Sequence, residues 1–228
     1  MRVSVNELEV RYTRALQGLG VPIGIAADAS WIVAWHDMMG WNGLGQFLAV
    51  VPALDGQIVP VPNITKDAEG WYLDAKGASL FVIGPGLVDT LEMAMATQTQ
   101  RVTLYNARDT GLLVGCADMA ARRGVSASWS ALDGDAVLSV MATPYALDVS
   151  KYPGGTADAG LTPDTIRCVV DAVGAGLDGW WGTPIDRLRS HTIATRLQDA
   201  VDDGVAVDDT QWQTVLDLGK RGLVNDTP

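Results

Sequence analysis

The stretch Arg101–Gly124 constrains the fold more than any other part of the sequence, because it combines a strand, a polar turn and a helix. Its first residues are β-formers, and Asn106–Asp109 then interrupt the apolar run. A polar turn at the start of a helix is a common place for a ligand, so Asn106–Asp109 is the first candidate for a binding site. The helix is predicted from apolar residues at helical spacing, which are Leu112, Leu113, Cys116, Met119 and Ala120, and it ends at Gly124.

Composition and charge limit the class of protein. With 228 residues, 48% of them hydrophobic, the chain can bury a substantial core. The net charge of −11 and only 16 basic residues argue against a nucleic-acid partner, because that affinity comes mainly from clustered Lys and Arg.

Cysteine and histidine usage argues against a metal centre. Cys116 and Cys168 both lie in apolar patterns, which predicts buried, reduced thiols rather than a disulfide. The only histidines are His36 and His191, too few for a zinc cluster, so no metal site is predicted, although Mg²⁺ or Ca²⁺ bound by carboxylates stays open. No signal peptide or apolar run of membrane-spanning length is present, and we expect a soluble cytoplasmic protein.

The first quarter of the chain is predicted to be helical. Ser4–Glu7 forms a capping box ahead of a helix to Gln17. A second helix runs from Pro22 to Met39, and a third occupies 44–54.

In the middle of the chain the pattern predicts a mixed sheet with flanking helices. Gly84–Gly86 is predicted to be a turn before a helix over 87–97, and a plain turn is favoured over a phosphate cradle because the third glycine of the nucleotide fingerprint is missing. The strands are expected at 71–74, 79–83, 102–105, 125–130 and 136–142.

An irregular, glycine- and proline-rich connection is predicted over 144–162, and it indicates a domain boundary. The expected division is an α/β core over 1–155 and a helical C-terminal segment over 156–228 that packs on this core. The helices of that segment are expected at 162–175 and 183–197, with a last one capped by Asp208 or Asp209 and ended by Gly222. The fold class is therefore α/β (α+β), with N-terminal helices, a mixed sheet and a helical tail.

Several of these segments together resemble the malate/L-lactate dehydrogenase-like oxidoreductases, whose nicotinamide-binding fold is not of the Rossmann type. The tail around Gly222–Asp226 is similar to a bacterial family of short paralogues. The segments that carry the dehydrogenase resemblance are Val3–Leu8, Gly18–Val21, Ala26–Ala27, Gly40 with Gly43, Glu69–Gly77, Leu91–Met95, Val102–Gly124 and Pro153–Gly155.

The chain departs from that family at both histidine motifs. Where the resemblance implies Ser-His-Gly, the sequence has Trp41-Asn42-Gly43, and the histidine of the Asn-x-x-His-x-Gly motif is replaced by Asp109. A later Gly-Thr-Asn-Pro segment of the family is also missing. Reduction of a 2-keto acid needs a proton donor and a cation for the carboxylate, so the loss of both imidazoles bears directly on activity.

Two residues could replace the lost imidazoles. Asp109 could act as a general acid if burial raised its pKa, and the alternative is a helix N-cap. His36 could take over proton donation in space, and the alternative is a histidine of the core or surface.

The candidate ligand-binding residues are Asn106, Arg108 and Gly111 in the polar turn. For Arg108 the alternative is plain exposure, and for Asn106 it is a bond within its own turn. His191, with Arg187 and Arg189, predicts a small cationic patch on a solvated helix.

Two functions follow as hypotheses. The first is a non-catalytic or strongly diverged homologue of these oxidoreductases that serves as a partner subunit or binds a small acid. The second is an active NAD(P)-dependent reductase of a 2-keto acid or cyclic imine with replaced catalytic groups. Whether the chain is an enzyme stays open, and NAD(P) is the cofactor that the resemblance implies. The expected partners are a second copy of the chain or a longer oxidoreductase subunit, with no nucleic acid and no membrane.

Overall fold

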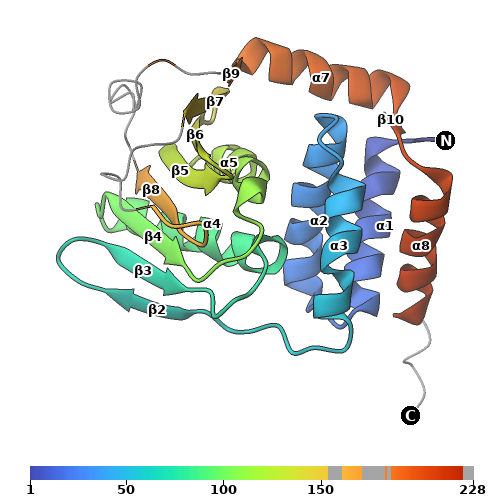
Figure 1. Ribbon diagram of the computed structural model, residues 1–228, viewed down its shortest axis with the longest axis horizontal. Helices are drawn as coiled ribbons and strands as arrows, with labels where there is room; N and C mark the ends of the chain where they lie inside the picture. Colours follow the sequence, from blue (N-terminus) through green and yellow to red (C-terminus); the bar gives the residue numbers. More distant parts are fainter. Residues whose placement is uncertain (154–160, 171–182, 184–185, 223–228) are drawn as a thin grey trace. The chain divides into compact units, whose positions relative to one another are not determined.

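The computed structural model describes residues 1–153, 161–170, 183 and 186–222. The chain forms two compact units, which we call the helical unit (Met1–Val59 and Ile193–Pro228) and the sheet unit (Pro60–Thr192). Figure 1 shows the elements of each. The expected α/β fold class, with helices first and a mixed sheet after them, is confirmed.

The helical unit contains the predicted N-terminal helices. The capping box is confirmed, since the Glu7 amide donates to Ser4 Oγ at 3.2 Å. The last helix is capped by Asp208, whose carboxylate accepts from the Gln211 amide at 2.9 Å. The helices are α1 (Val5–Gly18), α2 (Ile23–Met38), α3 (Gly43–Leu54), α7 (Ser190–Asp203, in this unit from Ile193) and α8 (Asp209–Arg221).

Segments from the two ends of the chain interlock in this unit. Strand β1 (Arg2–Val3) pairs antiparallel with β10 (Val205–Ala206). Helix α1 packs against α8 so closely that a Cβ at Gly18 would lie 2.0 Å from the carbonyl oxygen of Leu218. The N-terminal and C-terminal parts of the chain therefore share one core.

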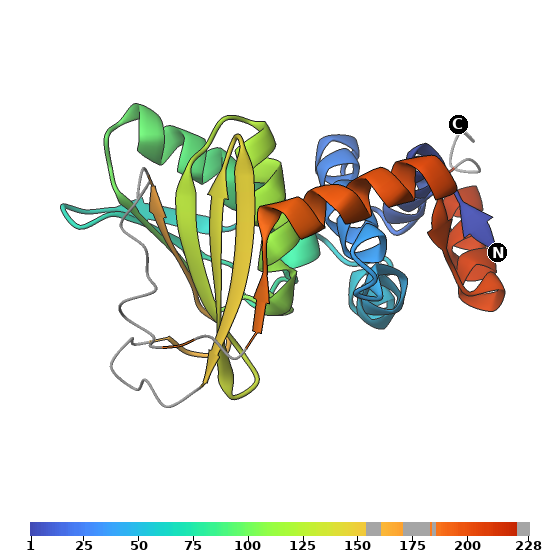
Figure 2. The same ribbon diagram turned by 90° about the horizontal axis from the view of Figure 1, so that it is seen from above.

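The described part of the sheet unit is built on eight strands in the order β2-β3-β4-β8-β5-β6-β7-β9. Among these strands, β3 and β4 pair in parallel, and the other neighbours are antiparallel. Helix α4 (Leu80–Ala96) contacts β3, β4 and β8, and α5 (Leu113–Arg122) contacts β5, β6 and β7 (Figure 2). The strands are β2 (Asn63–Lys66), β3 (Trp71–Asp74), β4 (Arg101–Tyr105), β5 (Ala127–Asp133), β6 (Ala136–Thr143), β7 (Ala146–Pro153), β8 (Ile166–Val170) and β9 (Asp186–Leu188).

The core of this unit is a row of paired residues beneath α4 and α5. Val102, Cys168, Trp129, Val140 and Val149 follow one another across five strands, and each is 5% exposed or less. Cys116 of α5 is also buried, and both thiols are free, as the sequence predicted. Burial raises the pKa of both cysteines, which keeps them protonated and unreactive.

The predicted strand over 79–83 and the turn at Gly84–Gly86 are wrong. Both lie inside α4, which begins after Ser79, and the Ser79 hydroxyl accepts from the Phe81 amide at 3.3 Å. The run Leu80–Ile83 is buried on all sides, and an apolar run without periodicity fits a buried helix as well as a strand.

The C-terminal part of the sheet unit was also predicted incorrectly. The expected irregular connection over 144–162 contains the strand β7, and the expected helix over 162–175 contains β8. The helix expected over 183–197 begins only at Ser190, after β9. Since β8 and β9 are strands of the sheet, the segment after residue 155 is not uniformly helical. Residues 154–160, 171–175, 184–185 and 223–226 of the predicted segments lie outside the described residues.

Among the described residues, none of the helices combines the length and hydropathy that crossing a membrane requires.

Candidate functional site

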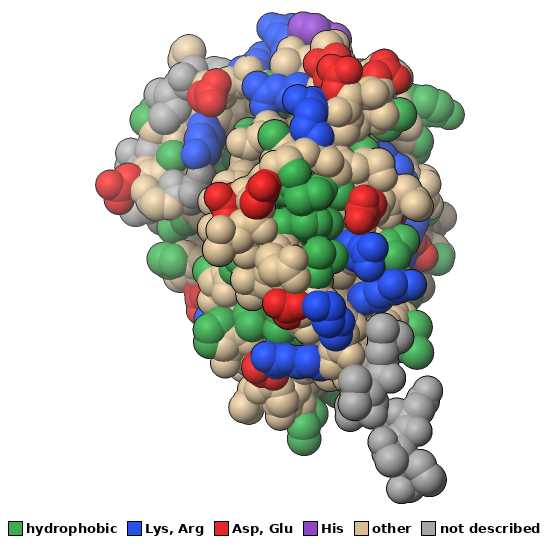
Figure 3. Space-filling model, turned by 90° about the vertical axis from the view of Figure 1, so that its right-hand side faces the viewer, with side chains coloured by type: hydrophobic (Ala, Val, Ile, Leu, Met, Phe, Trp, Pro, Cys, Tyr) green, Lys and Arg blue, Asp and Glu red, His purple; other side chains and the backbone are tan. Residues whose placement is uncertain are grey.

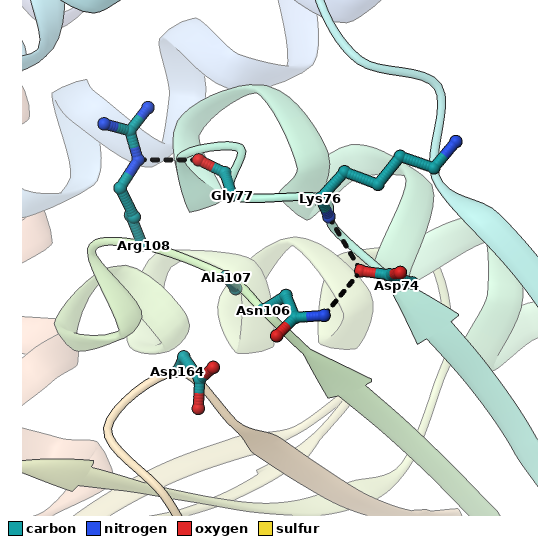
Figure 4. Close-up of a pocket in the computed structure, with 7 residues that line it drawn as sticks. All are labelled: Asp74, Lys76, Gly77, Asn106, Ala107, Arg108 and Asp164. Atoms are coloured by element: carbon teal, nitrogen blue, oxygen red, sulfur yellow. Dashed lines mark hydrogen bonds between the residues drawn. The ribbon is translucent and has the colours of Figure 1, made fainter.

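The site lies where the two parallel strands end. β3 ends at Asp74 and β4 at Tyr105, and the parallel pairing brings these carboxyl ends side by side. Ligands of α/β sheets commonly bind at such strand ends. A pocket of about 380 Å³ opens here (Figure 4), and we call it the strand-end pocket. It is lined by Asp74, Lys76, Gly77, Asn106, Ala107, Arg108 and Asp164.

Two successive turns form the floor of this pocket through backbone hydrogen bonds. The Gly77 amide donates to the Asn106 carbonyl at 2.7 Å, and the Arg108 amide donates to the Ala78 carbonyl at 2.9 Å. Asn106 and Lys76 both have left-handed backbone conformations, with φ of 55° and 51°. Asparagine tolerates this region better than most residues, which explains its use at the first position after β4.

Asp74 is held as an anion by its neighbours. One carboxylate oxygen accepts from Asn106 Nδ2 at 2.9 Å and from the Lys76 amide at 2.9 Å. The bond from Asn106, together with the Lys76 amide and the Lys76 charge, lowers the pKa of Asp74 below its usual value. The Asn106 side chain thus forms a hydrogen bond inside the site. Its position is compatible with both roles considered from the sequence, which are a contact with a ligand and a bond that holds the turns.

The cations of the pocket lie at its rim. Arg108 Nε donates to the Gly77 carbonyl at 2.6 Å, which fixes the guanidinium while its two terminal nitrogens project outward. Lys76 extends away from Asn106 and Asp164 in Figure 4. Both cationic side chains are exposed.

Asp164 enters the pocket from the loop before β8. The Ala107 amide donates to the Asp164 carbonyl at 3.0 Å, and Thr162 Oγ1 donates to the Asp164 carboxylate at 2.5 Å. Because β8 pairs antiparallel with β4, the residues before β8 meet the residues after β4. The pocket therefore combines segments that are about ninety residues apart in the sequence, from Asp74 to Asp164.

Asp109 and Gly111 lie beside the pocket without lining it. Asp109 is exposed with φ of 59°, and it holds the N-cap position of the short 3₁₀ helix η1 (Thr110–Leu112) without a side-chain cap bond. Gly111 is exposed within η1, with no atom within 4 Å of where a Cβ would lie. Of the turn residues predicted from the sequence, Asn106 and Arg108 line the pocket.

His36 belongs to the helical unit and is part of its core. The imidazole is 2% exposed, its Nδ1 lies 2.8 Å from the Ile32 carbonyl, and its ring packs against Trp35 and Trp41. An imidazole sealed in this way serves packing, which is the alternative that the sequence left open for it.

The segment that replaces the family's Ser-His-Gly motif has a structural role. Asn42 has a left-handed conformation (φ 53°) and caps α3 by accepting from the Gly45 amide at 3.1 Å. Asp37 accepts from the Leu44 amide at 2.8 Å and from the Tyr12 hydroxyl at 2.5 Å. Burial raises the pKa of Asp37, and burial beside Asp37 also raises the pKa of Tyr12.

The residues of the predicted cationic patch are on the surface, but they do not share one helix face, because Arg187 lies in β9, Arg189 precedes α7 and only His191 is in that helix. Arg187, Arg189 and His191 are all exposed, and Figure 3 shows basic side chains next to a histidine at one end of the face it presents.

Sequence reasoning missed Asp74, Lys76 and Asp164 as site residues. The signal for the first two was available, since Asp74-Ala-Lys-Gly77 follows a predicted strand just as Asn106–Asp109 does. Asp164 could not be found because its segment was predicted to be helical.

The fold is that of the malate/L-lactate dehydrogenase-like proteins. The malate dehydrogenase from Pyrococcus horikoshii OT3 matches with a TM-score of 0.68 and 12% identity, covering 97% of this chain and 95% of that one. A dehydrogenase from Sinorhizobium meliloti matches with a TM-score of 0.69 and 16% identity, covering 96% and 99%. The Δ1-piperideine-2-carboxylate reductase from Pseudomonas syringae pvar. tomato matches with a TM-score of 0.57 and 10% identity, covering 96% and 99%.

Comparisons of the sequence identify fewer relatives than the comparison of the fold. Residues 3–69 match a family described as "Protein of unknown function (DUF3726)", which is under a third of the chain. No curated protein matches the sequence. At these identities the structural likeness defines the fold and does not assign a reaction.

Proposed function

We propose that this chain is a strongly diverged member of the malate/L-lactate dehydrogenase-like fold that binds a small organic acid and acts without imidazole-based hydride transfer chemistry. The observation that carries the proposal is the lining of the strand-end pocket. It offers Arg108 for a carboxylate, and neither of the two histidines is among the described residues that line it.

The position of each replaced histidine supports this proposal. Asp109 stands where the resemblance implies one imidazole, and it is exposed beside the pocket. Where the other imidazole is implied, Asn42 caps a helix instead. His36 nearby is 2% exposed and bonded to its own helix. An imidazole that is sealed in a core cannot deliver a proton to a ligand in an open pocket.

Gly84–Gly86, whose sequence suggested a phosphate cradle, lies inside α4, and the start of this helix offers no free amide to the nicotinamide cofactor that the fold implies. At the start of α4 the Leu80 amide donates to the Arg108 carbonyl at 3.0 Å. The Val82 and Ile83 amides donate to the Ser79 carbonyl, and the Phe81 amide donates to Ser79 Oγ. These amides are already used, so this helix start offers none of them to a phosphate.

Calorimetric titration of the purified chain with small carboxylic acids, 2-keto acids, NADH and NADPH tests the proposal. We expect at least one acid to bind and no NAD(P)H to be oxidised in its presence. Sustained NAD(P)H oxidation with a 2-keto acid or cyclic imine would contradict the proposal.

One observation favours the second candidate function, an active NAD(P)-dependent reductase. The Asp109 carboxylate is exposed, adjoins Arg108 and makes no hydrogen bond to described residues, so it is free to meet a substrate. This function predicts that Asp109→Asn abolishes a measurable reductase activity. An unchanged rate in that variant would remove it.

The proposed partners are a second copy of this chain or a longer oxidoreductase subunit. Light scattering after size-exclusion chromatography measures the first directly. A monomer at micromolar concentration would rule out the homodimer.

A further inference from the structure

The charges that line the strand-end pocket are balanced. Asp74 and Asp164 supply two carboxylates, and Lys76 and Arg108 supply two cations, so the formal charge of the lining is zero. A ligand that carries only a negative charge would pair with the cations of the lining and offer nothing to its two carboxylates. A ligand with one charge of each sign would complement the lining.

Each of the two carboxylates of the pocket has one oxygen that accepts none of the hydrogen bonds described above. Asp74 uses one carboxylate oxygen for both of its bonds, to Asn106 and to the Lys76 amide, which leaves the other oxygen available. Asp164 also accepts through one oxygen, from Thr162. In Figure 4 the Asp164 carboxylate and the Asn106 side-chain oxygen are directed into the space between these two residues. Oxygen atoms of this kind accept hydrogen bonds and donate none.

The Arg108 guanidinium is also oriented by a hydrogen bond within the protein. The bond from Arg108 Nε to the Gly77 carbonyl orients the guanidinium and leaves both terminal nitrogens free of that bond. In Figure 4 Arg108 and Asp74 lie on opposite sides of the residues that line the pocket. A planar fork of donors is suited to a carboxylate, which it binds through two parallel hydrogen bonds.

We infer that the ligand of the strand-end pocket is a zwitterion, a small α-amino acid whose ammonium group is held by Asp74 and Asp164 while Arg108 holds its carboxylate. This inference rests on the proposed function and narrows it from organic acids in general to amino acids. No bond is made or broken in this step. The low pKa of Asp74 supports the assignment, because the carboxylate stays ionised throughout the neutral range.

The experiment compares ligands that share a carbon skeleton and differ in one charge. The full chain is titrated by calorimetry with leucine, with 4-methylpentanoate, which lacks the ammonium group, and with 3-methylbutylamine, which lacks the carboxylate. Alanine, propionate and ethylamine form a second set. We expect one amino acid to bind at least about tenfold more tightly than its matched acid and amine, as is usual for a charge-assisted hydrogen bond.

Two variants assign the effect to the carboxylates. Asp74→Asn and Asp164→Asn keep an acceptor oxygen for the existing bonds and remove the charge, and each is expected to abolish most of the preference for the amino acid over the acid. Asp135→Asn is the control, because Asp135 is an exposed carboxylate of the same unit that does not line the pocket. It is expected to bind both ligands as the unchanged chain does.

The outcomes separate this inference from the proposed function. Equal binding of the amino acid and its matched acid would overturn the zwitterion and leave the proposed function standing. Equal binding of the amine and the amino acid would overturn the role of Arg108 and the acid-binding function together. Failure of every member of both sets to bind would overturn both. A preference that survives Asp74→Asn and Asp164→Asn would overturn the zwitterion site at this place.

Discussion

In the helical unit the carboxylate of Asp37 is buried between Tyr12 and the start of α3, whereas in the sheet unit the carboxylate of Asp74 lies at the edge of an open pocket. Both accept hydrogen bonds, yet the pKa of Asp37 is raised and that of Asp74 is lowered. Burial dominates at the first and hydrogen bonding at the second. The same residue type therefore fixes a core in one unit and prepares a binding surface in the other.

The comparison extends to the groups around each carboxylate. In the helical unit Tyr12 packs edge-on against Phe47 and Trp212, so its hydroxyl is committed to the core. In the sheet unit the turns around the pocket are held by backbone hydrogen bonds, and the side chains of Lys76 and Arg108 are exposed. Substitutions should accordingly change stability in the helical unit and ligand binding in the sheet unit.

The largest effect is expected from Gly18→Val in the helical unit. A Cβ here would lie 2.0 Å from the Leu218 carbonyl oxygen, so α1 and α8 must separate. We expect a loss of about 3 kcal/mol in the free energy of unfolding, measured by urea denaturation. Gly24→Ala is the matched control, since no atom lies within 4 Å of its Cβ position, and it should be neutral or slightly stabilising. Similar losses in both variants would refute the tight packing of α1 on α8.

Tyr12→Phe should cost somewhat less. It removes the hydroxyl that donates to Asp37 at 2.5 Å and leaves a buried carboxylate with one donor fewer. We expect a loss of about 2 kcal/mol in the free energy of unfolding. Tyr145→Phe is the control, because Tyr145 is 95% exposed at a hairpin turn. A Tyr12→Phe variant as stable as the unchanged chain would show that Asp37 does not depend on this bond.

Arg108→Gln should separate binding from stability in the sheet unit. The guanidinium is exposed, so the free energy of unfolding should change by less than about 0.5 kcal/mol. Loss of its charge-assisted bonds should weaken the binding of an organic acid about tenfold. Calorimetry with Arg101→Gln as control measures the difference, since Arg101 is exposed and does not line the pocket. If Arg108→Gln bound the acid normally, Arg108 would not be the carboxylate ligand.

Asp37→Asn should change the pH dependence of stability. The pKa of Asp37 is raised in the folded chain, so its protonated form is favoured there. At a pH below its usual value the carboxyl is neutral in both states, and as the pH rises through the folded pKa its ionisation destabilises the fold. We expect the Tm of the variant, relative to the unchanged chain, to rise across this window and then level off. A relative Tm that stays flat or falls over the same range would contradict this account.

The smallest effect is expected from Asp109→Asn. The residue is exposed with φ of 59°, a region that asparagine tolerates, and its side chain makes no cap bond. The free energy of unfolding should change by less than about 0.5 kcal/mol. A larger loss, measured by urea denaturation, would show that this carboxylate has a structural partner, and it would weaken the contrast between the two units.

Local signals in the sequence were sufficient for α1, α2, α3 and α8 of the helical unit. The capping box at Ser4, the proline before α2 and the cap at Asp208 each mark a helix end through interactions within a few residues. The strand and helix of Arg101–Gly124 were predicted for the same reason. These elements do not depend on a distant segment to define their type.

The errors in the sheet unit have a different origin. Strand β8 is placed between β4 and β5 although it follows both in the sequence, so its state is set by pairing with distant partners. Its alternation of buried Ile166, Cys168 and Val170 was present in the sequence, but Thr162-Pro163 gave a competing helix-start signal. Asp164, one of the seven residues that line the pocket, was missed with it, because this residue is positioned by β8.

The pairing of β1 with β10 and the contact of Gly18 with α8 also matter during synthesis. A ribosome releases α1, α2 and α3 long before Leu218 leaves the exit tunnel, whereas Pro60–Thr192 emerges as one uninterrupted stretch. The nascent chain can therefore complete its eight-stranded sheet first, while the three leading helices wait with an uncovered apolar side for the last helix to arrive. Of the two units, the one whose synthesis starts first is thus the one that can be completed last.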